Sequence, residues 1–142
     1  MLEHVYRRAV ASDVFFRVVI ATDDKRIFDA AEKFGGDVVM TREDHPDGSS
    51  RVAEVAANID TDYVINIQGD EPVLDPRLLK DLAEGIAADR EADSATICVP
   101  ITREEDFHNP NIVKVVRAQN GRALYFSRSP IPYPRNESAC PV

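Results

Sequence analysis

The sequence predicts an α/β fold with three layers, in which helices cover both faces of a mixed, mainly parallel sheet. Over the first two thirds of the chain, short runs rich in β-branched residues alternate with segments whose apolar residues recur at helical spacing. This alternation is typical of a parallel sheet flanked by helices. In the last third, two apolar runs flank Gln119-Asn120-Gly121, which is typical of a hairpin turn, and a hairpin makes the sheet mixed.

Each predicted element rests on the spacing of its apolar residues. The predicted strands are residues 16–21, 37–40, 63–67, 94–99, 113–117 and 123–127. The predicted helices are residues 2–9, 27–34, 52–56 and 75–86. Gly35 and Gly36 end the second helix, because glycine suits the residue that follows a helix. Asp75 and Pro76 form a good N-cap and first helical position for the fourth helix.

Composition and charge narrow the possible functions. The chain has 142 residues, of which 44% are hydrophobic and 30% charged, as in a globular protein with one modest core. No apolar stretch approaches the roughly 20 residues of a membrane span, so no membrane insertion is expected. The net charge of −8 disfavours nucleic-acid binding. Cys98 is expected in the core, and the lack of a disulfide or zinc pattern makes a reducing, cytoplasmic location the expectation.

Both ends of the sequence are expected to be incomplete. A helix opens the chain, whereas in an α/β domain a first strand and its following loop usually carry the phosphate-binding turn. Residues 137–142 lead into no predicted element. We therefore expect residues 1–142 to form a single partial domain.

Gln68-Gly69-Asp70 follows directly on the predicted strand at residues 63–67. The carboxyl end of a parallel strand opens into the crevice where α/β proteins bind ligands. Gly69 allows a sharp turn or a close approach to a ligand. Asp70 would project into the crevice, where a carboxylate suits Mg²⁺. The alternative is a solvated turn that precedes the next helix.

Residues 41–51 connect a predicted strand to a predicted helix. Gly48-Ser49-Ser50 could offer backbone N–H groups and hydroxyls to a ligand at the start of that helix. Arg42 and Arg51 could add planar hydrogen-bond donors. The alternative is ordinary helix capping by the serines, with both arginines on the surface.

Three further segments place polar residues at the ends of predicted elements. Asp23 or Asp24 is expected to cap the second helix. Lys114 lies in mid-strand, where a lysine is either an exposed edge residue, the commoner case, or the partner of a buried anion. Arg128 follows a strand, where it either clamps a carboxylate or phosphate or is solvated. His45 is expected to be a loop histidine.

Five segments together indicate a family. They are ATDD, MTREDHPDGSSR, NIQGDEP, NPNIVKVV and ALYFSRSPIP. In this order and at these separations they closely resemble the 3-deoxy-manno-octulosonate cytidylyltransferases, also called CMP-Kdo synthetases. The resemblance extends from Met1 to about Arg135, and QGDEP is its most specific part. It implies a three-layer α/β/α, Rossmann-like nucleotidyltransferase fold.

The resemblance also implies an activity. Enzymes of this family transfer CMP from CTP to 3-deoxy-D-manno-octulosonate (Kdo) and release pyrophosphate, and CMP-Kdo feeds lipopolysaccharide biosynthesis. They depend on Mg²⁺ and are typically homodimers. For the dimer of this protein, the candidate surfaces are the first helix, Phe16 and the hairpin.

A role for each candidate residue follows from the resemblance. Asp70 would be the metal ligand, with Gln68 a sugar contact beside it. Arg128 would face the sugar acid and complete the catalytic group. The residues that resemble the nucleotide-binding part are Gly48, Ser49, Arg51 and Gly69. Asn111 and Lys114 would lie near the site.

The sequence departs from the family pattern in three places. An N-terminal Ile-Pro-Ala-Arg stretch and a following Arg-Leu-Pro-Gly-Lys stretch, which hold the triphosphate, are absent. A C-terminal portion with a second metal-binding aspartate is absent too. The family often has Ser-Gly-Thr-x-Arg where residues 47–51 read Asp-Gly-Ser-Ser-Arg, so Asp47 adds a charge near the expected nucleotide. We expect the 142 residues alone to have little or no turnover.

Two alternatives remain open. The enzyme could act on a related sugar acid such as 8-amino-Kdo, because many sugar contacts fall outside this sequence. The chain could also belong to an inactive paralogue that serves as a binding module. Asp70 beside Gln68 favours an active enzyme over the paralogue.

Overall fold

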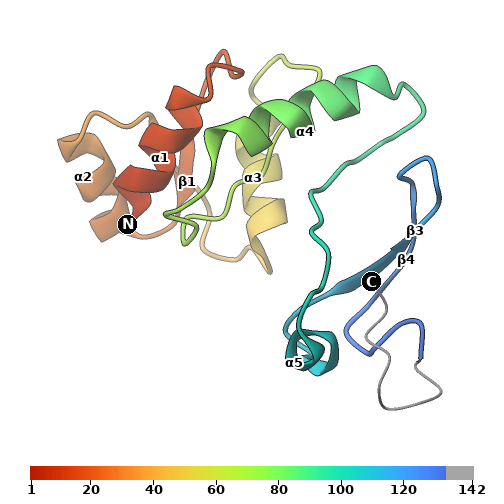
Figure 1. Ribbon diagram of the computed structural model, residues 1–142. Coiled ribbons are helices and arrows are strands. Elements are labelled where there is room, and N and C mark those ends of the chain that lie inside the picture. Colours follow the sequence, from red (N-terminus) through yellow and green to blue (C-terminus); the bar gives the residue numbers. More distant parts are fainter. Residues whose placement is uncertain (134–142) are drawn as a thin grey trace. The chain divides into compact units, whose positions relative to one another are not determined.

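The computed structural model of the protein describes residues 1–133 (Figure 1). Its helices are α1 (Leu2–Ala11), α2 (Lys25–Lys33), α3 (Gly48–Ala56), α4 (Pro76–Ala88) and α5 (Glu104–His108). Its strands are β1 (Ile20–Thr22), β2 (Val38–Met40), β3 (Lys114–Arg117) and β4 (Ala123–Ser127). The chain divides into two compact units, Met1–Ala95 and Thr96–Val142. The predicted α/β class is confirmed, and the first unit contains its parallel strands.

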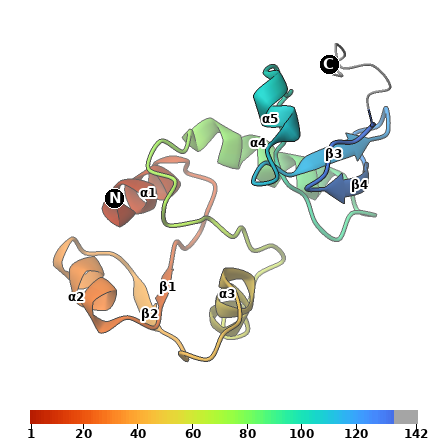
Figure 2. The same ribbon diagram turned by 90° about the horizontal axis from the view of Figure 1, so that it is seen from below.

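A parallel strand pair organises the first unit. β1 pairs with β2 so that Ile20 stands opposite Val38 and Thr22 opposite Met40, and α2 connects the two strands. α2 packs against both strands and α3 against β1, and Figure 2 shows β1 between these two helices. α1 packs against α4. The buried apolar residues of this unit are Val5, Ala9, Ile20, Ala31, Leu79 and Ile86.

Aspartates begin three of the helices. The side chain of Asp24 accepts a hydrogen bond from the backbone N–H of Arg26 at the start of α2. Asp47 caps α3 and Asp75 caps α4 in the same manner. Each cap satisfies an N–H group that has no partner inside the helix. The predicted Asp75-Pro76 start is confirmed, and of the two candidates for α2 the cap is Asp24.

The Asp75 cap predicts a specific dependence of stability on pH. Hydrogen bonds from the guanidinium and the backbone N–H of Arg77 lower the pKa of Asp75 from 3.8 to about 2. The unfolded chain therefore takes up a proton at higher pH than the folded chain does. The stabilisation is complete above about pH 5 and is lost progressively as the pH falls through 3.8 to about 2.

Replacing Asp75 by asparagine is expected to remove this part of the pH dependence while keeping a cap, because asparagine also accepts the N–H bond. The measurement is the free energy of unfolding in urea from about pH 5 to about pH 2. Asp81→Asn, which removes an exposed carboxylate from the same helix, is the control. If the free energy of unfolding of Asp75→Asn changed with pH as steeply as that of the unsubstituted protein, Asp75 would not be the source of this pH dependence.

Two glycines occupy positions that require a positive φ. Gly35 follows α2 with φ of 76° and donates its N–H to the carbonyl of Glu32, which confirms the predicted helix end. Gly121 has φ of 88° in the turn between β3 and β4. β3 and β4 are antiparallel, with Lys114 opposite Ser127, so the predicted hairpin is confirmed.

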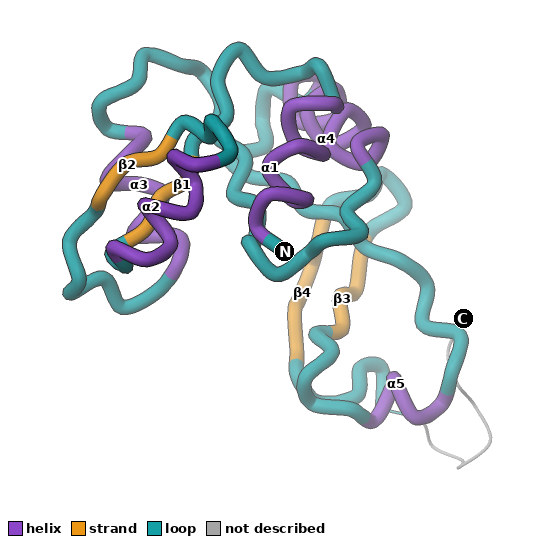
Figure 3. Tube along the Cα trace, turned by 90° about the vertical axis from the view of Figure 1, so that its left-hand side faces the viewer, coloured by secondary structure: helices purple, strands orange, loops and turns teal. Residues whose placement is uncertain are grey.

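The predicted continuous sheet is wrong for the described residues. The strands of residues 1–133 form two separate two-stranded sheets. Residues 63–67 and 94–99, both predicted as strands, are drawn as loop in Figure 3. Within residues 1–133, no backbone hydrogen bond joins either segment to another strand, and a strand without a partner has no ladder. Cys98 lies in the second of these segments and is exposed, contrary to the prediction that it is a core residue.

A helix that crosses a membrane must be long and apolar. Among residues 1–133, every helix falls short of the length and hydropathy that a membrane crossing requires.

Candidate functional site

The first turn of α3 and the Gln68-Gly69-Asp70 segment lie together in the first unit. A Cβ atom placed on Gly48 would lie 3.7 Å from Nε2 and 3.8 Å from Oε1 of Gln68. Asn66 extends its Nδ2 to within 3.4 Å of the Ser49 hydroxyl. Segments about 20 positions apart in the sequence therefore meet at one helix N-terminus, where exposed N–H groups favour an anion.

Arg51 connects this helix turn to the ends of both parallel strands. Its guanidinium donates hydrogen bonds to Asp23 Oδ2 at 2.8 Å, to Thr41 Oγ1 at 2.5 Å and to the carbonyl of Arg42 at 3.1 Å. Thr41 is buried, and the Arg51 side chain is only 18% exposed. Arg51 therefore holds the loops after β1 and β2 against α3. Its contact with a nucleotide stays a prediction.

The structure gives Asp47 a local role. Its Oδ1 accepts the backbone N–H of Ser50 at 2.7 Å, and the Ser50 hydroxyl donates to its carbonyl at 2.8 Å. The hydrogen bonds from Ser50 lower the pKa of Asp47. The cap of α3 is therefore Asp47 and not one of the serines, and the negative charge of this carboxylate is placed at the favourable end of the helix.

His45 fastens the loop before α3 to the helix. Its imidazole contacts the Glu54 carboxylate, which also accepts the backbone N–H of Arg42. The hydrogen bond from His45 is the main cause of a lowered pKa at Glu54. His45 is a loop histidine, as predicted, and its side chain is only 6% exposed.

Asp70 lies in an exposed turn directly after Gln68. Within residues 1–133 its carboxylate has no ion pair or hydrogen bond, and no group of three or more metal-ligating side chains is present there. Mg²⁺ usually binds through one or two carboxylates together with substrate phosphates, so a single free carboxylate fits this ion. Gly69 faces α1, because a Cβ there would lie 3.4 Å from Leu2 Cδ1.

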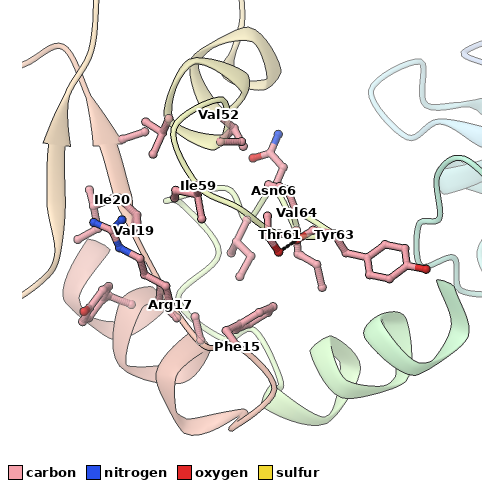
Figure 4. Close-up of a pocket in the computed structure, with 18 of the residues that line it drawn as sticks. Phe15, Arg17, Val19, Ile20, Val52, Ile59, Thr61, Tyr63, Val64 and Asn66 are labelled. Carbon is pink, nitrogen blue, oxygen red and sulfur yellow. Dashed lines mark hydrogen bonds between the residues drawn. The ribbon is translucent and has the colours of Figure 1, made fainter. Parts of the chain in front are cut away.

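A cavity of about 530 Å³ lies beside these residues in the first unit (Figure 4). Gly48, Gln68 and Gly69 contribute to its lining, and most of the remaining wall is apolar. Figure 4 shows Val19 and Ile20 on one side of the cavity and Val64 on the other.

Lys114 is a buried cation of the second unit, with an exposed fraction of 2%. Its Nζ donates to the carbonyls of Asn109 at 2.6 Å, Ile112 at 2.9 Å and Arg128 at 3.0 Å. The prediction that Lys114 is exposed is therefore wrong, and within residues 1–133 no carboxylate pairs with it either. Backbone carbonyls satisfy the ammonium group in place of a carboxylate.

Arg128 is exposed and donates from Nη1 to the carbonyl of Pro110 at 2.9 Å. Together with the Lys114 bonds, this contact ties the end of β4 to residues 109–112. Arg128, Asn111 and Lys114 belong to the second unit, whereas Gly48, Ser49, Arg51, Gln68, Gly69 and Asp70 belong to the first. The structure thus groups the predicted residues into two sets.

Comparison with known proteins identifies the family to which this chain belongs. Residues 1–140 match the family model described as cytidylyltransferase. The chain belongs to the cytidylyltransferase family. The resemblance inferred from the five sequence segments is thereby confirmed at the level of the family.

Relatives of this cytidylyltransferase chain carry a more specific name. It is 45% identical to 3-deoxy-manno-octulosonate cytidylyltransferase of Syntrophotalea carbinolica, over 95% of this chain and 54% of the relative. It is 50% identical to the protein of the same name from Thioalkalivibrio sulfidiphilus, over 96% of this chain and 55% of the relative. The chain thus spans about half the length of the curated relatives it matches.

A solved structure is similar to this cytidylyltransferase chain with a TM-score of 0.91 and 45% identity. It is described as CMP:2-keto-3-deoxy-manno-octonic acid synthetase complexed with CTP. The similarity covers 97% of this chain and 57% of the solved one.

Sequence reasoning missed three residues of the candidate site. Asp23 and Thr41 bind Arg51, and Asn66 reaches Ser49. The sequence predicts Asp23 only as a candidate helix cap. Its position next to Asp24 is a signal, since one helix needs only one cap and the second carboxylate is free for another partner.

Proposed function

We propose that the full-length protein is a 3-deoxy-manno-octulosonate cytidylyltransferase, which forms CMP-Kdo and pyrophosphate from CTP and Kdo for lipopolysaccharide biosynthesis. The observation that carries the proposal is the position of Gln68 near Gly48 at the α3 N-terminus, beside the exposed Asp70. It occurs in a chain that is 45–50% identical to enzymes of this name. Neither 8-amino-Kdo as the substrate nor an inactive paralogue is favoured by an observation of this kind.

The proposed reaction is an attack of the anomeric hydroxyl of Kdo on the α-phosphate of CTP. Catalysis of such a transfer consists mainly of alignment and of stabilising the charge on the phosphate oxygens. Gly48 and Ser49 would bind the nucleotide through the N-terminus of α3. Gln68 and Arg128 would orient the sugar acid, with the planar guanidinium matched to its carboxylate.

Asp70 and Gly69 would complete the nucleotide side of the site. Asp70 is proposed to hold Mg²⁺, which would supply a Lewis acid that lowers the pKa of the attacking hydroxyl. Gly69 would keep the backbone close to the nucleotide. The exposure of Asp70 and its freedom from protein partners within residues 1–133 support this assignment.

Arg51 is proposed to act on the reaction by positioning the α3 turn. Replacing it by lysine keeps the charge but not the planar geometry that reaches Asp23, Thr41 and the Arg42 carbonyl. We expect kcat/KM for CTP to fall by about 10- to 100-fold in the full-length enzyme, because a small displacement of a binding segment has a large kinetic effect.

The control for Arg51 is Arg42→Lys, which alters an exposed arginine of the preceding loop. Steady-state rates at varied CTP and saturating Kdo measure both variants. If Arg51→Lys and Arg42→Lys had the same kinetic constants, the positioning role would be excluded.

Release of pyrophosphate tests the function itself. The full-length protein is expected to release pyrophosphate from CTP only when both Kdo and Mg²⁺ are present. Competition between Kdo and 8-amino-Kdo then identifies the preferred sugar. Full-length protein that is folded but releases no pyrophosphate with either sugar would contradict the enzyme and favour the paralogue.

The proposal extends to fold, assembly and location. Residues 1–142 are proposed to be part of a three-layer nucleotidyltransferase domain and to have little or no turnover alone. The enzyme is proposed to be a cytoplasmic homodimer. Exposed apolar side chains of the hairpin, Leu124, Tyr125 and Phe126, support a contact between copies. Light scattering of the full-length protein measures the assembly.

A further inference from the structure

The loop between β2 and α3, at residues 41–47, is fastened to α3 by one carboxylate. Oε2 of Glu54 accepts the backbone N–H of Arg42 at 3.3 Å and also contacts Nε2 of His45. The carbonyl of Arg42 is held as well, because it accepts a hydrogen bond at 3.1 Å from Arg51 of α3. The start and the middle of the loop are therefore both bound to the helix that follows.

The contact between His45 and Glu54 has a defined direction. Hydrogen bonds from His45 and from Arg42 lower the pKa of Glu54, so its carboxylate is ionised at neutral pH. An ionised carboxylate only accepts hydrogen bonds, and Nε2 of His45 therefore carries the hydrogen. The imidazole is 6% exposed and the Glu54 side chain 31%, so little water is available to replace this bond.

A short and stiff stretch of chain links His45 to the first turn of α3. Pro46 has a fixed φ, and the residue before a proline is restricted to extended conformations. Asp47 follows with an extended backbone and caps the helix by accepting the N–H of Ser50 at 2.7 Å. Because these residues have little freedom to absorb a displacement, a change at the imidazole reaches Gly48 at the start of α3.

We propose that His45 and Glu54 are positioning residues for CTP binding, and that their hydrogen bond, the His45–Glu54 clasp, holds Gly48 and Ser49 where they bind the nucleotide. Neither side chain of the clasp touches the nucleotide, since both act through the chain at the start of α3. A turn that must first be ordered binds its ligand more weakly in the ground state and the transition state alike. The inference rests on the proposed function and adds two residues to it.

Two replacements of His45 separate its hydrogen bond from its bulk. The amide nitrogen of glutamine reaches about as far as Nε2, whereas that of asparagine reaches only as far as Nδ1, so His45→Gln still donates to Glu54. In the full-length enzyme, His45→Asn is expected to raise KM for CTP about 10-fold and to change kcat by less than about twofold. His45→Gln should stay within about threefold of the unsubstituted KM.

Pyrophosphate release at varied CTP, with saturating Kdo and Mg²⁺, measures these constants. Equal KM values for His45→Asn and His45→Gln would overturn the proposal, because the position of the donor would then not matter. Thermal unfolding checks that both variants are folded.

A double-variant cycle tests whether the two residues act together. Glu54→Ala removes the acceptor and is expected to raise KM for CTP at least as much as His45→Asn, whereas Glu43→Ala, which removes an exposed carboxylate from the loop, is the control. The double variant of His45→Asn and Glu54→Ala should match Glu54→Ala alone, because His45 then has no acceptor left to lose. Additive effects would refute the clasp. The Glu54 and Glu43 variants provide the test if His45→Asn does not fold.

Two measurements that need no turnover separate the clasp from the proposed activity. In calorimetric titration of the full-length protein with CTP and Mg²⁺, Kd for CTP should rise about 10-fold in His45→Asn but not in His45→Gln. The amide of Ser50, which donates to Asp47, should exchange at least about fivefold faster in His45→Asn. A protein that releases no pyrophosphate but shows both differences would refute the activity and retain the clasp. An unchanged Kd in His45→Asn would refute the clasp even in an active enzyme.

Discussion

Replacing Asp70 by asparagine in the full-length protein is expected to lower kcat for CMP-Kdo formation by about 100- to 1000-fold. Asparagine has nearly the same shape but lacks the charge that attracts a divalent cation. Since Asp70 is exposed and has no ion pair or hydrogen bond within residues 1–133, the substitution should leave the folded state unchanged. Pyrophosphate release measures the rate, and thermal unfolding checks the fold.

Two controls make the Asp70 result specific. Glu71→Gln removes the adjacent exposed carboxylate and should retain most of the activity. Loss of a metal ligand should also change how the rate depends on Mg²⁺. Asp70→Asn should therefore need a higher Mg²⁺ concentration than the unsubstituted enzyme to reach half of its own maximal rate. Near-normal kcat, or a loss of rate with an unchanged Mg²⁺ requirement, would show that Asp70 is not the metal ligand.

Replacing Lys114 by methionine is expected to destabilise the second unit by about 3 kcal/mol. Methionine has a similar length but donates no hydrogen bond. The carbonyls of Asn109, Ile112 and Arg128 would lose the ammonium group that they share. Buried carbonyls without partners are costly, so the loss should exceed that of an exposed lysine.

Exchange of the amides in β3 and β4 measures the Lys114 effect locally. Arg117→Met, which removes an exposed cation from the same strand, is the matched control and should have a small effect. Because the Lys114 bond also fixes the carbonyl of Arg128, KM for Kdo should rise in Lys114→Met. Unchanged amide exchange would mean that the three carbonyls find other partners.

Contacts between nearby residues were the part of the fold that could be predicted. The Asp75 cap depends on a backbone group two positions away, and the hairpin at Gly121 depends on a turn of a few residues. The strand prediction for residues 63–67 also described the local pattern correctly, because their side chains alternate. It failed as a strand because pairing requires a partner, and residues 1–133 provide none.

The sequence by itself determined the α/β class, the Asp75 cap and the hairpin, and it singled out Gly48, Arg51, Gln68 and Asp70 as candidates. Only the tertiary structure decided that Arg51 would be bound to Asp23 and Thr41, that Gln68 would lie against Gly48, and that Lys114 would be buried among carbonyls. Caps and turns join residues two to four positions apart, so the neighbouring sequence is enough to specify each cap or turn. The contacts of Arg51, Gln68 and Lys114 join segments up to 28 positions apart, and which partner satisfies a buried charge is settled only when those segments pack together.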